Sequence, residues 1–239
     1  MEKRESLWAG GPSYWYDDAL FPPGTDSFLL AAFPPLRPGD RVCDLGAGTG
    51  LLGLLLFARE PSIRLSNVEI LPEALALAER TCQENGVAAD QYLADLRSLP
   101  AALGAGGFDL VISNPPSFAR SAGRPAKGAA RRTARSETSC TIGDVCAAAR
   151  RLLRWGGRFC LVYRPERLCD LLEAMRRDGL EPKRLRLVCH GPASSPSLVL
   201  AEGRRGGKPG LRLEPPLVLH GPDGSDTPEL RRIYFRDLP

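Results

Sequence analysis

The sequence predicts an α/β fold with a mostly parallel, seven-stranded sheet, helices on both faces and an antiparallel final strand. Seven short apolar runs are predicted to be strands, and segments with helical periodicity separate most of them; this alternation is typical of parallel sheets. Polar or glycine-rich residues follow four of the runs, which predicts a ligand crevice where parallel strands end. The expected strands are residues 41–43, 63–68, 91–93, 108–113, 158–163, 185–190 and 197–202.

Residues 1–40 are expected to form a turn-rich flap and one helix ahead of the sheet. Glycine and proline interrupt this stretch, while residues 25–32 have the apolar pattern of a short helix that Thr25 or Asp26 could cap. The aromatic rings of the flap could contact a nucleobase or pack onto the domain, and we favour packing. These aromatic residues are Trp8, Tyr14, Trp15, Tyr16 and Phe21.

The segment from Asp44 to Gly50, Asp-Leu-Gly-Ala-Gly-Thr-Gly, joins the first strand to a helix predicted at 51–58. Glycines permit tight turns and let a ligand approach the main chain. The free N–H groups at the helix start favour polar or anionic ligand atoms. The segment lacks the Lys-Ser/Thr ending of a P-loop, which disfavours a triphosphate ligand.

Acidic residues follow the next two strands. Glu69 ends strand 63–68, where a carboxylate can accept hydrogen bonds from the two hydroxyls of a ribose. Pro72 then opens a helix that Asn85 and Gly86 close. Asp95 follows strand 91–93 and could either accept a hydrogen bond from an adenine amino group or cap a surface turn. Its position relative to Glu69 favours the ligand role.

The sequence Asn114-Pro115-Pro116 comes directly after the buried strand 108–113. Two prolines cannot continue a strand and give a stiff, extended turn. The turn would hold the Asn114 amide and the adjacent carbonyl groups at the mouth of the crevice. Together with the glycine turn and the two acids, this turn resembles that of methyltransferases that alkylate planar nitrogens, such as adenine N6 or glutamine amides.

Two basic segments are candidate contacts for the phosphates of a nucleic acid. The first is a run of basic residues, without acidic residues among them, that follows the Asn-Pro-Pro turn. The alternative interpretation is that these residues form only a solvated, charged loop. A second basic loop is expected between Glu202 and Leu211. The basic candidates are Arg120, Arg124, Lys127, Arg131, Arg132 and Arg135 in the first segment and Arg204, Arg205 and Lys208 in the second.

The remaining third completes the α/β alternation. A helix is expected at 140–155, a turn at Gly156-Gly157, and a second helix at 166–178 that Gly179 ends. The tail is expected to carry a short helix or strand at 229–234. We expect one domain over 1–239, with a flap at 1–40, a core at 41–203 and a basic loop and tail at 204–239.

Composition favours a soluble cytoplasmic enzyme. No apolar run is long enough to span a bilayer, and the first residues lack the apolar core of a signal peptide. The seven cysteines include no C-x-x-C pair, so reduced, buried thiols are expected in place of a zinc site or disulfides. His190 and His220 have no neighbouring metal ligands in sequence, and we expect no metal site.

These motifs resemble those of Rossmann-like class I S-adenosylmethionine-dependent methyltransferases. The resemblance implies that the glycine turn contacts the methionine part of the cofactor, Glu69 the ribose and Asp95 the adenine. A dehydrogenase shares the turn and the acid, but it does not need the Asn-Pro-Pro turn. The resemblance assigns the cofactor to Asp44, Gly46, Ala47, Gly48, Gly50, Glu69, Ile70, Asp95, Leu96 and Asn114.

From about residue 26 to 234, the order of features is similar to the bacterial tRNA(Val) adenine-N6 methyltransferase family. The similar stretches include Val68-Glu69, Ser113–Pro116, Leu153–Gly157 and Tyr163–Leu168. The resemblance implies methylation of the adenine 3′ of the anticodon and binding of the anticodon stem-loop. We expect no membrane partner and a monomer or weak homodimer. The implied catalytic residues are Asn114, Pro115, Pro116 and Phe118.

One position departs from the family pattern. An aromatic residue usually follows the second proline, whereas this chain has Ser117 and then Phe118. Phe118 could supply the stacking ring after a shift of one residue, or the ring is lost. The alternatives left open are a protein-glutamine N5 methyltransferase, a DNA methyltransferase, and a non-catalytic RNA-binding relative.

Overall fold

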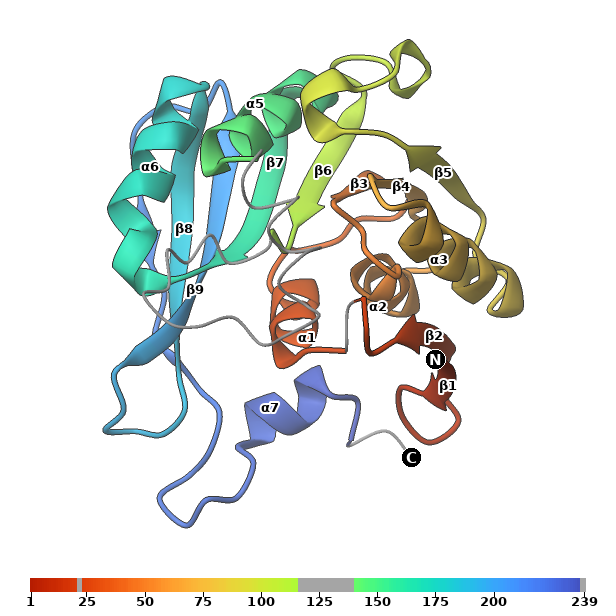
Figure 1. Cartoon of the computed structure of the whole chain (residues 1–239). Coiled ribbons are helices and arrows are strands. Elements are labelled where there is room, and N and C mark those ends of the chain that lie inside the picture. Colours follow the sequence, from red (N-terminus) through yellow and green to blue (C-terminus); the bar gives the residue numbers. More distant parts are fainter. Residues whose placement is uncertain (21–22, 116–139, 237–239) are drawn as a thin grey trace.

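The computed structural model describes residues 1–20, 23–115 and 140–236, and a mixed sheet crosses the whole molecule (Figure 1). Its strands are β3 (Arg41–Leu45), β4 (Arg64–Glu69), β5 (Ala89–Leu93), β6 (Phe108–Ser113), β7 (Leu153–Tyr163), β8 (Leu180–Cys189), β9 (Pro196–Arg205), β10 (Arg212–Leu213) and β11 (Leu217–Val218).

The strand order is β10-β8-β9-β7-β6-β3-β4-β5, and β11 also pairs with β8. Neighbouring strands from β7 to β5 are parallel, whereas β9 is antiparallel to both β7 and β8. The seven-stranded, mostly parallel sheet with an antiparallel last strand is therefore confirmed, and the short β10 and β11 extend it. Because β3, β4, β5, β6 and β7 are parallel, their carboxyl ends lie at one edge, here called the carboxyl edge.

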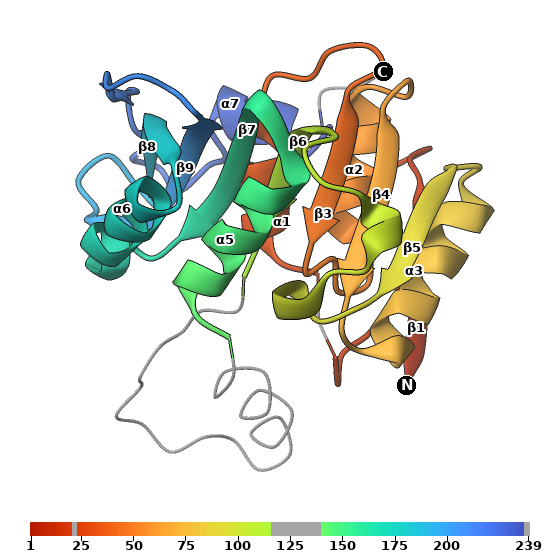
Figure 2. The same cartoon turned by 90° about the horizontal axis from the view of Figure 1, so that it is seen from above.

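Helices cover both faces of this sheet, as predicted. Alternate residues of the strands separate two cores: Val42, Leu110 and Cys160 pack with α1 and α2 residues, whereas Cys43 and Val111 pack with α5 and α6 residues. Figure 2 shows α5 and α6 side by side. The helices are α1 (Thr25–Ala32), α2 (Leu51–Arg59), α3 (Pro72–Glu84), α5 (Ile142–Leu152), α6 (Leu168–Arg177) and α7 (Pro228–Ile233), with 3-10 turns η1 (Leu96–Ser98), η2 (Ala101–Leu103) and η3 (Pro165–Arg167).

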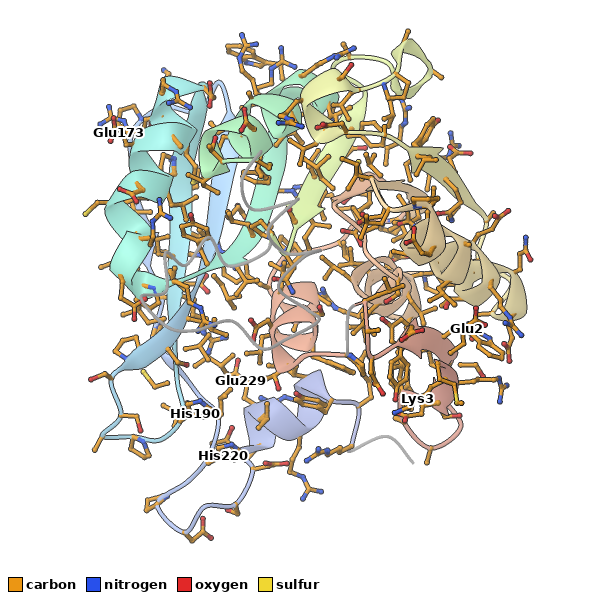
Figure 3. All side chains as sticks on the ribbon, viewed as in Figure 1. Glu2, Lys3, Glu173, His190, His220 and Glu229 are labelled. Carbon is orange, nitrogen blue, oxygen red and sulfur yellow. The ribbon has the colours of Figure 1, made fainter. Side chains whose placement is uncertain are left out.

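The expected flap contains a β-hairpin that the sequence did not predict, formed by β1 (Glu2–Ser6) and β2 (Ser13–Asp17). All of β1 is exposed. Its Glu2 and Lys3, labelled in Figure 3, form ion pairs with Arg80 of α3 and with Asp18. The hairpin lies beside α3 (Figure 1). The Asn85 side chain clamps it there, accepting from the Ser13 N–H at 2.9 Å and donating to the Ser13 carbonyl at 2.7 Å.

The aromatic rings of the flap pack onto the domain, which is the interpretation that we favoured. Tyr14 and Tyr16 are buried, and the Arg80 guanidinium lies 3.4 Å from the centre of the Trp15 ring. Trp8 stacks on Phe235, with ring centres 4.0 Å apart, so the two ends of the chain meet. Phe21 lies outside the described residues.

The junction between α5 and β7 differs from the prediction. α5 ends at Leu152 and β7 begins at Leu153, so Trp155 is not helical and the glycines at 156 and 157 lie inside a strand. The register explains this arrangement, because Phe108 pairs with Leu153 while Leu110 pairs with Arg158. The intervening residues of β7 form a bulge rather than the expected turn.

The tail forms a short helix, α7, which packs on α1 (Figure 1). The rings of Phe28 and Tyr234 stack with their centres 4.5 Å apart, and the Tyr234 hydroxyl lies 3.0 Å from that of Thr25. No helix within the described ranges is long and apolar enough to cross a membrane.

Candidate active site and cofactor crevice

The glycine turn connects β3 to α2 at the carboxyl edge. Gly46, Gly48 and Gly50 have φ angles of +79°, +55° and +83°, which side chains with a Cβ rarely adopt. The backbone N–H groups of Gly46 and Ala47 both donate to the Val68 carbonyl at 2.9 Å. These bonds hold the turn against the end of β4.

Two of these glycines have different surroundings. A Cβ on Gly46 would meet no atom within 4 Å, whereas one on Gly50 would lie 2.9 Å from the Cβ of Ala78. Gly46 therefore borders open space at the crevice. Gly50 allows α2 to begin directly against α3.

Glu69 joins the two loops that form the crevice. It is buried, and its Oε2 accepts a hydrogen bond from the N–H of Gly48 at 2.8 Å. Its Oε1 accepts from the N–H groups of Ile70 and Leu71, both at 2.9 Å. Burial raises the pKa of Glu69, and the three N–H bonds oppose that shift. The carboxylate therefore fixes the shape of the crevice, and its predicted contact with a ribose stays a prediction.

Asp44 is a buried carboxylic acid at the base of the glycine turn. Its Oδ2 accepts from the Gly53 N–H at 3.2 Å, while its Oδ1 is buried and has no partner among the described groups. Burial raises the pKa of Asp44 to about 7, with a further contribution from Glu69. An unpartnered buried oxygen of this kind is costly unless a ligand donates to it.

The neighbouring strands present apolar side chains at the same edge. Ile70 is 50% exposed and Leu93 is 58% exposed, although large aliphatic side chains are usually buried. Leu96 is half-buried against the α5–α6 core. A flat apolar ligand such as an adenine would cover such side chains.

Asp95 adopts the turn-capping role that the sequence left open. It precedes η1, and its Oδ1 accepts from the backbone N–H of Arg97 at 2.9 Å. The Arg97 guanidinium binds the same carboxylate, and this bond keeps the pKa of Asp95 below its usual range. The predicted contact of Asp95 with an adenine stays a prediction, and each carboxylate oxygen can accept more than one hydrogen bond.

Asn114 follows β6 at the carboxyl edge. The Asn114 Nδ2 atom donates to the Oγ of Ser27, on α1, at 3.2 Å. The strand end beneath it is braced, because the Ser113 hydroxyl donates to the Leu45 carbonyl at 2.7 Å and Pro115 is buried. The structure thus brings the end of the Asn-Pro-Pro strand next to the start of the glycine turn, as the sequence predicted.

A hydrogen bond also links the N-terminal hairpin to the glycine turn. The hydroxyls of Tyr14 and Thr49 are hydrogen-bonded, and both residues are buried. Burial raises the pKa of Tyr14 to about 12, so the phenol stays protonated. Sequence reasoning gave Ser27 no role at the site, and it suggested Tyr14 only as a ring that could contact a base or pack onto the domain. Their hydroxyls reach it from segments distant in sequence, and no local motif marks such contacts.

Several predicted site residues lie outside the described ranges. These are Pro116, Phe118, Arg120, Arg124, Lys127, Arg131, Arg132 and Arg135, together with Ser117.

The second basic segment is not the loop that was expected. β9 continues to Arg205, so Arg204 and Arg205 belong to a strand, and the turn begins at Gly206. Leu180, at the start of β8, pairs with Arg205. Arg204, Arg205 and Lys208 therefore lie at the sheet edge opposite the glycine turn. They are not part of the cofactor crevice.

Most of the cysteines are buried, and the two histidines lie next to each other. All seven cysteines are free, and five are buried. The rings of His190 and His220 stack 6.3 Å apart near α7 (Figure 3). Within the described part of the chain, no group of three His, Cys, Asp or Glu residues could hold a metal ion.

The crevice fits S-adenosylmethionine, the cofactor that the motifs imply. The space beside Gly46 leaves room for a ligand against the main chain, and the unpartnered Oδ1 of Asp44 offers an acceptor to an ammonium group. The exposed Ile70 provides an apolar surface for an adenine ring.

Comparisons with known proteins agree with this geometry. Residues 21–176 match the family model of the methyltransferase small domain. A tRNA1(Val) (adenine(37)-N6)-methyltransferase of Dickeya chrysanthemi is 33% identical, over 81% of this chain and 76% of the relative. One of the same name from Porphyromonas gingivalis is 31% identical, over 88% of this chain and 86% of the relative.

Solved structures support the fold. A protein from Agrobacterium tumefaciens, described as a predicted O-methyltransferase, superposes with a TM-score of 0.71 at 21% identity, over 88% of this chain and 96% of that one. Geranyl diphosphate C-methyltransferase from Streptomyces coelicolor, in complex with S-adenosyl-L-homocysteine, has a TM-score of 0.54 at 13% identity, over 75% and 74%. The chain is therefore a member of the methyltransferase small domain family, among the relatives named tRNA1(Val) (adenine(37)-N6)-methyltransferase, and S-adenosyl-L-methionine is its cofactor.

Proposed function

We propose that this protein methylates N6 of an adenine in tRNA, the adenine 3′ of the anticodon of a valine tRNA. The observation that carries the proposal is the Asn114 carboxamide, which stands at the carboxyl edge beside the glycine turn with its N–H group bound by Ser27. Relatives at 29–33% identity that are named for this reaction on tRNA support the choice of substrate.

Binding of the cofactor uses the two loops that Glu69 joins. Gly46, Gly48 and Gly50, with Ala47, would accommodate the methionine part, and Asp44 would accept a hydrogen bond from its ammonium group. Glu69 would bind the ribose, while Ile70, Asp95 and Leu96 would contact the adenine. When bound, the cofactor supplies an electrophilic methyl group on a sulfonium.

Asn114 and Pro115 act on the target amine. The lone pair of an adenine N6 is delocalised into the ring, so the free amine is a poor nucleophile. The Asn114 Oδ1 atom and the Pro115 carbonyl accept hydrogen bonds from the two N–H groups of this amine. These bonds favour tetrahedral geometry at the nitrogen and direct its lone pair toward the methyl donor. Orientation and electrostatic stabilisation then lower the barrier. The proton that the nitrogen loses after the transfer passes to water.

The substrate adenine has to leave its loop to enter the crevice, which costs little in single-stranded RNA. Phe118, after the Pro116 turn, is the proposed stacking ring. The basic run from Arg120 to Arg135 would contact phosphates near the target. We further propose a cytoplasmic enzyme, where tRNA is available, that acts as a single-domain monomer or weak homodimer.

The test is transfer of a labelled methyl group from S-adenosylmethionine to bulk tRNA that lacks its native modifications. Nucleoside analysis is expected to recover the label as N6-methyladenosine. Label on a glutamine of a protein substrate, or in DNA, would contradict the proposal. Binding of the cofactor with no transfer to any tRNA would indicate a non-catalytic relative instead.

A further inference from the structure

Trp155 is an exposed aromatic residue in the bulge of β7. Its side chain is 74% exposed, which is unusual for an indole. The bulge produces this exposure, because the chain advances from Leu153 to Arg158 while β6 advances only from Phe108 to Leu110. Gly156, with a φ of +76°, permits the sharp backbone path.

A glycine turn supports one side of the indole. Gly206 follows β9 with a φ of +67°, and a Cβ there would lie 2.3 Å from the Trp155 ring. The ring therefore rests on the backbone of residue 206, and any other residue type would displace it. An aromatic ring supported in this way, and still largely exposed, can accept a second planar group.

Cations surround this ring. Trp155 lines a hollow of about 280 Å³ with Lys183, Arg204, Arg205 and Lys208. Arg204 donates to the Gly156 carbonyl at 3.0 Å, Arg205 to the Leu153 carbonyl, and Lys183 to the Lys208 carbonyl at 3.1 Å. Among the described residues, none of these four cations forms an ion pair with a carboxylate. No carboxylate is therefore in direct contact with these cations, although Glu181 lies opposite Arg204 on the neighbouring strand.

The hollow lies across the sheet from the crevice. Trp155 is near the start of β7, and Tyr163 ends that strand at the carboxyl edge. From Arg158, where the bulge ends, the five extended residues to Tyr163 span roughly 17 Å. A ligand in the hollow therefore cannot be the methylated base itself.

We propose that this hollow, here called the Trp155 site, binds an unpaired nucleotide of the same tRNA roughly 17 Å or more from the methylated adenine. The base stacks on the exposed face of Trp155, and the cations contact the adjoining phosphates. Stacking on aromatic rings combined with cationic side chains is the usual chemistry of single-stranded nucleic acid binding. The inference rests on the proposed function, because it requires a tRNA substrate.

The test measures steady-state methylation of full-length, unmodified valine tRNA by Trp155→Ala and Trp155→Phe. The alanine variant is expected to raise KM for tRNA about fivefold to hundredfold, with kcat and the cofactor Kd unchanged. Trp155→Phe keeps a ring and is expected to recover most of the affinity. A short oligonucleotide that carries the target adenine but extends less than ~17 Å from it should show no effect of either variant.

The contribution of the cations to tRNA binding is tested with Lys208→Ala, and Arg64→Ala serves as the matched control. Arg64 is exposed at the start of β4, on the same edge of the sheet but outside the hollow. Lys208→Ala is expected to reduce the slope of log Kd against log salt by about one, and Arg64→Ala to leave it unchanged. Equal effects of the two variants would overturn the assignment.

The two proposals fail in different ways. If the wild type methylates tRNA and Trp155→Ala has the wild-type KM, the Trp155 site is wrong and the proposed function stands. If the wild type methylates no tRNA, the proposed function fails, and this inference fails with it.

Discussion

The side-chain nitrogen of Asn114 lies 3.2 Å from the hydroxyl oxygen of Ser27, a residue 87 positions earlier in the chain. A carboxamide has one donating and one accepting end. Because Ser27 engages the donating end, the Oδ1 atom remains an acceptor for an incoming amine. The first turn of α1 thus sets the orientation of the side chain on which the proposed chemistry depends.

Replacement of Asn114 by alanine removes that acceptor. We expect kcat to fall by at least about a hundredfold, because an electrostatic contact to the reacting group is lost. The Kd for the cofactor, measured by calorimetry, should change less than about threefold, since the glycine turn and Glu69 are untouched. Wild-type turnover in this variant would contradict the mechanism.

Ser27→Ala leaves Asn114 in place but frees its orientation. The loss of one hydrogen bond is expected to lower kcat about threefold to tenfold, with little change in the cofactor Kd. Ser27→Thr retains the hydroxyl and serves as the control, which should restore most of the rate. If the alanine variant turns over like the wild type while remaining folded, Ser27 has no positioning role.

Gly46→Ala and Gly50→Ala separate the ligand-facing glycine from the packing glycine. Both have φ near +80°, so alanine costs ~1–2 kcal/mol of stability at either position. A Cβ at residue 50 also overlaps Ala78, which adds ~1–3 kcal/mol for overpacking. Urea unfolding should therefore show the larger loss for Gly50→Ala.

Cofactor binding should rank the same two variants differently. Gly46→Ala is expected to weaken cofactor binding more than Gly50→Ala does, because the new methyl group at residue 46 enters the space beside the turn. Unchanged affinity in Gly46→Ala would show that this space does not hold the cofactor.

The raised pKa of Asp44 leads us to expect a pH dependence of the stability of the folded protein. Its pKa is raised from 3.8 to about 7 by burial, so between these values the folded state holds a proton that the unfolded state has released. The stability contributed by this group is fully present below pH 3.8 and is lost as the pH rises through 7. The Tm of the ligand-free protein should therefore fall between pH 5 and 8, and Asp44→Asn should reduce this slope.

The cofactor should bind more tightly as the same group ionises. Ionised Asp44 attracts the cationic ligand, so the wild-type Kd is expected to fall as the pH rises through 7, and Asp44→Asn should lack that component. A wild-type Kd that is unchanged across this range would contradict the contact between Asp44 and the ligand.

The sequence predicted the elements whose signals are local. α1 at 25–32 and β6 at 108–113 have the expected bounds, because their apolar runs identify them without tertiary information. The predicted cap of α1 by Thr25 or Asp26 is wrong, since Gly24 occupies the N-cap and no side chain caps the helix. The crevice was predictable for a related reason. Glu69 and Asn114 follow parallel strands, and the topology brings the ends of such strands together.

The features that were missed depend on contacts distant in sequence. β1 has no buried face, so its hydrophobic pattern gives no strand signal, and the hairpin depends on its pairing with β2 and its contacts with α3. The sequence predicted a turn at Gly156-Gly157 where the structure has a bulge, because a pair of glycines is compatible with both. Arg204 and Arg205 were assigned to a loop for a similar reason, since charged residues at an exposed strand end resemble loop residues.

The central claim is that the chain methylates N6 of one adenine, and mapping of the methyl group on a single tRNA tests it most directly. Unmodified valine tRNA and the same transcript with guanine in place of the adenine 3′ of the anticodon would be incubated with the enzyme and labelled S-adenosylmethionine. We expect N6-methyladenosine at that nucleotide in the first transcript and no label in the second. Equal labelling of the two transcripts, or label on another nucleotide, would contradict it.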